Sequence, residues 1–200
     1  GGVLVADIRP AVLTQHARPL KAGYLDKTFG VRRKQISGGH TISGRPEMRR
    51  DAGALGQLAK LTADLRADKT VTALPGAKVG GNINGTPICI TNRVGRGRAI
   101  LLNFALDEYA TLQAEGTHRP MQLALGGLLK EIGLPAQVTV TEKGMPVDWL
   151  DTPRWKRGDA LIVAVDRGSS NPSNDPPRDV KLQWPRAGHI YDILRGKYLG

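Results

Sequence analysis

The chain has 200 residues, of which 40% are apolar and 24% are charged, and its formal net charge is +11. These values are typical of a globular protein with one or two domains and a hydrophobic core. No apolar run approaches the roughly 20 residues that a membrane-spanning helix needs, and one cysteine excludes both a disulfide framework and a cysteine-rich metal site.

The positive charge is concentrated in residues 1–60, which carry 11 Lys or Arg against 4 Asp or Glu. The densest stretches are VRRKQ (31–35) and PEMRR (46–50). Such a patch can bind nucleic acid through its phosphates. Aromatic residues that could stack on bases make up only 4% of the chain, however, and no nucleic-acid motif accompanies the charge. A solvated surface, or a face covered by an acidic neighbour, is therefore favoured.

The chain begins with an apolar run, GVLVAD (2–7), that is typical of a strand covered on both faces in a parallel sheet. A buried strand needs a neighbouring element, so we expect the chain to be a piece of a longer protein, and its localisation is not predicted. Residues 8–20 contain too much proline for a helix. Residues 22–31 predict a short helix that ends at Phe29, with Gly30 as the residue after the cap.

Residues 34–56 are polar and rich in glycine and predict an extended surface loop, whereas TVTALP (70–75) predicts a strand. Two apolar, β-rich segments then flank RVGRG (93–97), which indicates a β-hairpin. A dinucleotide-binding loop would need a third glycine and a following helix. Neither is present, since a strand pattern follows Gly97.

Residues 107–120 predict a loop at the carboxyl end of a strand, where ligands bind in open α/β sheets. The apolar spacing of residues 121–134 predicts a helix that Gly133 and Pro135 end. Beyond it, short alternating segments separated by turn residues indicate an all-β module. We therefore predict an α/β domain over residues 1–138 and a β-sandwich module over residues 139–200.

No combination of residues in the chain predicts a catalytic or metal site. Asp107 and Glu108 are adjacent, so on a strand they point to opposite faces and cannot easily form the carboxylate pair of a glycosidase. In a loop they could form one, but nothing in the sequence positions a partner. The four histidines lack metal-binding spacing, and no G-x-S-x-G motif is present. Cys89 lies in an apolar strand pattern and is interpreted as a small buried hydrophobe. Asp7 is interpreted first as a cap or hydrogen-bond acceptor for the following loop.

Four stretches together carry a family resemblance: GGVLVADIRPAV (1–12), GYLDKTFGV (23–31), GTPICITNRVGRGRAILLNFALDEY (85–109) and GHIYDILRGKYLG (188–200). In this order they resemble the C-terminal half of β-galactosidase-like glycoside hydrolases related to family 42. The resemblance implies a flavodoxin-like domain, also called the trimerisation or glutamine-amidotransferase-like domain, that is partial here and is followed by a partial β-sandwich. Residues 34–70 match no part of that pattern.

The resemblance implies a non-catalytic accessory segment whose parent carries its catalytic glutamates on a TIM barrel that precedes it. It implies no catalytic residue, metal or cofactor in this chain. The partners that it implies are the barrel, further copies of the chain in a trimer, and carbohydrate. Asp7, Arg9, Asn103 and Tyr109 are the residues expected to border a sugar site formed with another domain or subunit.

Two other hypotheses stay open from the sequence. One is a basic module that binds nucleic acid or another polyanion through residues 9–60, for which Arg32, Arg33, Arg49 and Arg50 are the test residues. The other is a free-standing α/β enzyme, which would act without any motif that the sequence shows.

Overall fold

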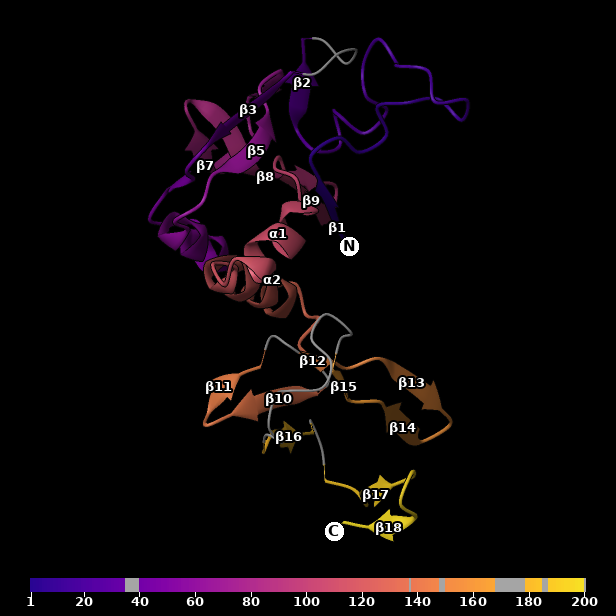
Figure 1. Cartoon of the computed structure of the whole chain (residues 1–200). Coiled ribbons are helices and arrows are strands. Elements are labelled where there is room, and N and C mark those ends of the chain that lie inside the picture. The colour runs from indigo at the N-terminus through magenta and orange to yellow at the C-terminus, as the bar shows by residue number, and fades with distance from the viewer. Residues whose placement is uncertain (35–39, 137, 148–149, 168–178, 185–186, 200) are drawn as a thin grey trace. The chain divides into compact units, whose positions relative to one another are not determined.

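The computed structural model describes the chain except for residues 35–39, 137, 148–149, 168–178, 185–186 and 200. The chain divides into two compact units, Gly1–Pro135 and Ala136–Gly200, and Figure 1 shows the elements of each. The boundary predicted from the sequence lies between residues 138 and 139. Each unit is described by itself below.

The first unit is built on a five-stranded sheet with the strand order β1-β9-β8-β7-β4. Its strands are β1 (Val3–Asp7), β4 (Glu47–Met48), β7 (Lys78–Ile83), β8 (Thr86–Val94) and β9 (Gly97–Leu102). β1 runs parallel to β9, with Val5 opposite Ile100, and every other neighbouring pair is antiparallel. The carboxyl ends of β1 and β9 therefore meet at one edge of the sheet.

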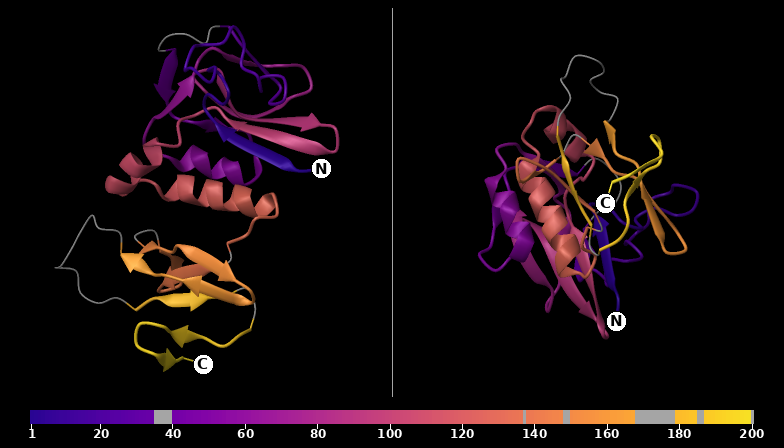
Figure 2. Two further views of the ribbon diagram at one scale, coloured as in Figure 1. Left: turned by 90° about the vertical axis from the view of Figure 1, so that its right-hand side faces the viewer. Right: turned by 90° about the horizontal axis from the view of Figure 1, so that it is seen from below.

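Two small ladders and three helical elements complete this unit. The ladders pair β2 (Val31–Arg33) with β6 (Val71–Ala73), and β3 (Thr41–Gly44) with β5 (Leu65–Asp68). The helical elements are the 3₁₀-helix η1 (Gly53–Lys60), α1 (Glu108–Ala114) and α2 (Arg119–Glu131). In the left view of Figure 2 they form a layer beside the sheet.

The sheet is covered differently on its two faces. Along β9 the side chains alternate, so Ile100 and Leu102 pack in the cluster that contains the buried residues of η1, α1 and α2. Ala99 and Leu101 face the other way and pack with Phe29 and with the β2–β6 ladder. Both faces of β9 are thus buried, the first by helices and the second by a loop and a small ladder.

Strands are the only regular secondary structure among the described residues of the second unit. β10 (Thr139–Glu142) lies between β11 (Met145–Pro146) and β16 (Lys181–Gln183). Three separate pairs are β12 (Leu150–Asp151) with β15 (Asp166–Arg167), β13 (Arg154–Arg157) with β14 (Ala160–Val163), and β17 (Tyr191–Asp192) with β18 (Lys197–Tyr198).

The predicted fold class is wrong. A flavodoxin-like domain has parallel strands with helices on both faces, whereas here only β1 and β9 are parallel and the described helices pack on one face. The expectation that β1 is covered on both faces is also wrong, because β1 is an edge strand in which Val3 and Leu4 are exposed and the other residues are half-buried. The described part of the second unit forms small separate ladders rather than the two packed sheets of a sandwich.

Several local predictions can be compared with the structure. The hairpin at RVGRG is confirmed, since Val94 pairs with Gly97 and Gly95 has a φ of 56°. The strand near residue 71 and the helix over 121–134 are confirmed as β6 and α2. The predicted loops are wrong, because 107–120 contains α1 and 34–56 contains β3 and β4. The predicted helix over 22–31 is also wrong: residues 24–30 form turns, and Gly30 has a φ of 68°.

Candidate functional site

The candidate site lies at the edge of the sheet where the parallel strands β1 and β9 end. Asp7 is the last residue of β1 and is paired with Leu102, the last residue of β9. Asn103 follows directly and is fully buried. The sequence singles out Asp7 because it ends a strand, a place where ligands bind in open sheets, whereas Asn103 is expected at a site from the family resemblance.

The carboxylate of Asp68, at the end of β5, is fully buried, and the backbone of this residue contacts Asn103 at this edge. Its Oδ1 accepts hydrogen bonds from the Thr70 backbone N–H at 2.9 Å and from the Thr70 hydroxyl at 2.7 Å. Its Oδ2 accepts a bond from Arg9 Nε at 2.9 Å and lies 3.5 Å from Arg33 Nε. Both oxygens of Asp68 are therefore occupied by donors from the chain itself.

Arg33 is buried beside it and joins a second carboxylate. Its guanidinium donates to Asp26 and, at 3.0 Å, to the carbonyl of Ile8. Burial lowers the pKa of Arg33, and the charge of Arg9 acts in the same direction, whereas Asp68 raises it. The pKa of an ordinary arginine side chain is so far above neutral pH that Arg33 stays charged despite this shift. We call Arg9, Asp26, Arg33, Asp68 and Thr70 the Asp68 cluster.

The formal charges of the Asp68 cluster cancel, with two guanidinium groups against two carboxylates. A general base, nucleophile or metal ligand needs an oxygen lone pair that a substrate or ion can reach. Asp68 offers none, because it is buried and held by Thr70 and the two arginines. The cluster instead links residues 8–33 to β5, and the pairing of its charges offsets the cost of burying them.

The structure joins two of the four predicted site residues through Asp68. Arg9 bonds its carboxylate, and Asn103 Nδ2 donates to its backbone carbonyl at 3.0 Å and to the carbonyl of Pro87 at 2.9 Å. Asn103 Oδ1 is buried without a hydrogen-bond partner among the described residues. Asp7 is half-buried, and its carboxylate makes no hydrogen bond or ion pair with a described residue, so its expected bond to the following loop is not seen.

Tyr109 lies apart on α1. Its ring packs edge-on against His118, with 5.7 Å between the ring centroids and an interplanar angle of 81°. It is half-buried against the cluster that contains the helices. The structure therefore gives Tyr109 a packing role in the first unit.

The sequence patterns did not reveal Asp26, Arg33, Asp68 and Thr70 as members of the site. A signal for two of them exists, since Asp-x-Thr after a strand is typical of a turn in which the Asp side chain accepts from the residue two positions on. The arginine partners could not be read in this way, because Arg9 is 59 residues from Asp68 in the sequence.

Other candidate chemistry is limited. Within the described ranges, no three His, Cys, Asp or Glu side chains lie together as a metal site. Cys89 is buried as expected, and burial raises its pKa to about 12. No helix among the residues that the structure describes is both long and apolar enough to cross a membrane.

The hypothesis that residues 9–60 bind a polyanion has fewer exposed arginines than the sequence suggested. Arg33 is fully buried, and Arg49 pairs with Asp51 at 3.2 Å, whereas Arg32 and Arg50 are exposed. A buried arginine cannot reach a phosphate backbone. The four arginines that the sequence suggested for polyanion binding therefore do not form one exposed set.

No family model matches the sequence, and no curated protein matches it. Solved structures do match. A β-galactosidase from Bacillus circulans sp. alkalophilus is 15% identical with a TM-score of 0.59, and the match covers all of this chain and 27% of that one. Gan42B, a GH42 β-galactosidase from G. stearothermophilus, is 13% identical with a TM-score of 0.57 and is covered over 26% of its length.

A cold-adapted β-galactosidase from Rahnella sp. R3 is 18% identical, with a TM-score of 0.53, and the match covers 92% of this chain and 27% of that one. The chain shares its fold with one segment of these β-galactosidases. It spans about a quarter of the length of each structure that it matches.

Proposed function

We propose that this chain is a non-catalytic accessory segment of a β-galactosidase-like glycoside hydrolase. The observation that carries the proposal is the match of the whole chain, across both units, to about a quarter of several β-galactosidases. The motifs that suggested this family in the sequence occur in both units. The sequence motifs and the fold therefore both support a segment related to these glycoside hydrolases.

The state of the buried carboxylates supports a non-catalytic role. A glycosidase needs two carboxyl groups that can exchange a proton and approach the sugar. Asp68 and Asp26 are both engaged with Arg33. We therefore propose that the catalytic pair lies in another part of the parent protein, on the TIM-barrel domain that the family resemblance implies.

The accessory role that we propose has two parts. The first is self-association of the parent, as the trimer that the resemblance implies. The second is a contribution to the sugar site of a neighbouring domain or subunit. Asp7 is the strongest candidate for the second part, because it ends β1 half-buried and its carboxylate makes no hydrogen bond with a described residue. Arg9 and Asn103 would support the site without contacting the sugar through the groups that already bond Asp68.

The test is hydrolysis of nitrophenyl β-D-galactoside by the parent protein that carries this segment. We expect the parent to hydrolyse it, and we expect Asp7→Ala to lower kcat/KM by about tenfold, the effect of removing one charged hydrogen bond. Asp51→Ala, which removes an exposed carboxylate, serves as the matched control. A parent without glycosidase activity would contradict the proposal, and an unchanged kcat/KM in Asp7→Ala would contradict its sugar-lining part.

A further inference from the structure

The β13–β14 hairpin of the second unit presents an exposed aromatic side chain next to an arginine. Trp155 is paired directly with Ile162, and Arg157 is paired with Ala160. Residues two apart on a strand, and residues directly opposed across an antiparallel pair, project on the same face. All four residues are exposed, and Trp155 is 55% exposed. We call this set the Trp155 face; it carries an indole ring, an aliphatic side chain and a guanidinium group.

Packing within the second unit does not account for the whole of the Trp155 face. Among the described strands, β13 and β14 pair only with each other. The half-buried residues of β14 are Leu161 and Val163, which lie on the opposite face of the hairpin. Trp155 and Ile162 can stabilise the hairpin as a cross-strand pair. Arg157 has no such role, because it stands opposite an alanine.

The positive charge of this hairpin is not neutralised by the residues that the structure describes. β13 has the sequence RWKR, and none of its three cations makes a hydrogen bond or ion pair with a described residue. Residues 154–163 contain a single carboxylate, that of Asp159 in the turn. Three cations therefore stand against one anion, and the guanidinium group of Arg157 is available beside the exposed indole ring.

An indole ring and a guanidinium group on one face match a sugar ring that carries a negative charge. The face of an aromatic ring is negatively polarised and packs against the C–H groups of a pyranose ring. A guanidinium group binds a carboxylate in a planar, two-pronged geometry. Nucleic acid offers comparable contacts through its bases and phosphates, but the function proposed above favours a carbohydrate.

We propose that Trp155 and Arg157 bind an acidic polysaccharide, a polymer whose sugar rings carry carboxylate groups. The choice of a carbohydrate rests on the proposed function, whereas the choice of an acidic one rests on the charge of the hairpin. The indole ring stacks on one sugar ring, and Arg157 pairs with a carboxylate of the polymer. The Trp155 face would thereby attach the parent protein to the polymer.

The test is calorimetric titration of the parent protein with polygalacturonate at low ionic strength, with galactan as the neutral polymer. We expect saturable binding of polygalacturonate that weakens as salt is added, and weaker binding of galactan. Trp155→Ala and Arg157→Gln should each weaken the binding of polygalacturonate about tenfold, because one removes the stacked ring and the other a charged hydrogen bond. Since Arg157 is exposed, Arg157→Gln should keep the melting temperature of the wild type.

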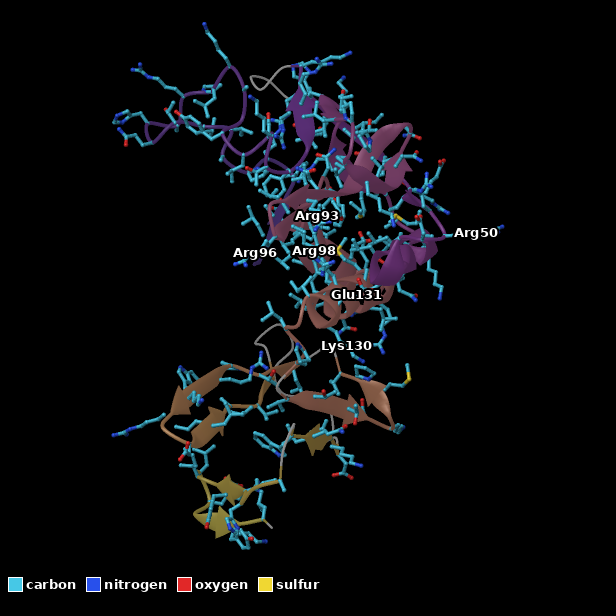
Figure 3. All side chains as sticks on the ribbon, turned by 180° about the vertical axis from the view of Figure 1, so that it is seen from behind. Arg50, Arg93, Arg96, Arg98, Lys130 and Glu131 are labelled. Atoms are coloured by element: carbon cyan, nitrogen blue, oxygen red, sulfur yellow. The ribbon has the colours of Figure 1, made fainter. Side chains whose placement is uncertain are left out.

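Arg50→Gln is the matched control, because Arg50 projects from the first unit (Figure 3) and, like Arg157, is exposed without a partner among the described residues. It should bind polygalacturonate like the wild type. Failure of the wild type to bind this polymer would overturn the proposal. So would unchanged affinity in a Trp155→Ala, Arg157→Gln double variant, or an equal loss of affinity in Arg50→Gln.

Two further outcomes separate this proposal from its alternatives. Tighter binding of single-stranded DNA than of polygalacturonate would assign the Trp155 face to nucleic acid and overturn the proposal. Binding is measured without hydrolysis, so it is independent of the test of the proposed function. A parent that binds polygalacturonate through Trp155 and Arg157 but leaves nitrophenyl β-D-galactoside intact would support this site and contradict only the glycosidase assignment.

Discussion

At the scale of single residues, the buried carboxylate of Asp68 is the clearest determinant of the fold near the candidate site. It contacts two arginines that are distant in sequence, Arg9 and Arg33, and accepts hydrogen bonds from the nearby Thr70. Burying a charge is costly unless it is paired and hydrogen-bonded. The contacts of the cluster therefore link residues 8–33 to β5, and removal of one charged member would leave another charge buried without its partner.

Asp68→Asn should be strongly destabilising. It removes one of two negative charges and leaves Arg9 and Arg33 with a single buried carboxylate between them. Breaking a buried ion pair in this way costs about 3–5 kcal/mol, measured as the free energy of unfolding in urea. Asp51→Asn, at an exposed carboxylate that Arg49 and Lys78 contact, should change it little. Equal effects of the two substitutions would show that the burial of Asp68 does not matter.

Cys89 should be inert in the folded chain. Burial raises its pKa to about 12 from the usual 9.0, and only the thiolate reacts with alkylating agents. We expect iodoacetamide at pH 8.5 to modify Cys89 only when the chain is unfolded by urea. Rapid modification without urea would contradict its burial.

The raised pKa of Cys89 also makes the free energy of unfolding depend on pH. The folded state holds the Cys89 proton more tightly than the unfolded state, so this contribution is complete below pH 9 and is lost as the pH rises toward about 12. Cys89→Ala should lack this part of the alkaline decline in the free energy of unfolding. An identical decline in the variant would contradict the shift.

The residues of the site could be predicted only in part from the sequence. Asp7 ends an apolar strand, a position that the local pattern makes visible, whereas Arg9 and Asn103 are expected only from the family resemblance. Asp68 has its backbone bonded to Asn103 across 35 residues and its carboxylate bonded to Arg9 across 59. Such long-range hydrogen bonds arise only in the folded chain, so the spacing of neighbouring residues in the sequence does not predict them.

At the scale of elements, the close packing of α2 on η1 depends on one glycine. A Cβ added at Gly127 would lie 2.5 Å from the Cβ of Ala54, whereas a Cβ added at the neighbouring Gly126 would meet nothing within 4 Å. The two glycines sit next to each other in the same helix. They therefore allow the effect of packing to be separated from the effect of helix propensity.

Gly127→Ala should lower the free energy of unfolding by about 1–3 kcal/mol, because the added methyl group overpacks the contact with Ala54. Gly126→Ala should raise it by about 0.5–1 kcal/mol, since alanine favours the helix and costs no space there. Thermal or urea denaturation measures both. Stabilisation by both substitutions would contradict the close approach of α2 and η1.

The elements differ in how far the sequence reveals them. The β8–β9 hairpin is encoded locally, by two glycines between two apolar runs, and was predicted with its turn. α1 has only seven residues, too few for a clear helical period, and was missed. The fold class was missed because the direction of a strand is not written in its own sequence: the pairing of β1 with β9 joins residues more than 90 positions apart.

At the scale of the whole molecule, the account rests on the chain being one segment of a larger glycoside hydrolase. All of the chain matches the β-galactosidase of Bacillus circulans sp. alkalophilus, yet it covers only 27% of that protein. The carboxylates of the Asp68 cluster are engaged in ion pairs. The sequence patterns also predict no pair of catalytic carboxylates. Both observations are accounted for if catalysis belongs to another part of the parent chain.

The most direct measurement is the mass of the polypeptide that an antibody against this segment detects in its native source. This chain alone has a mass of 21.5 kDa. The account predicts a band several times heavier, whose sequence outside this segment contains two carboxylates suited to glycoside hydrolysis. A single band at 21.5 kDa would contradict it, because the segment would then act without a catalytic domain on its own chain.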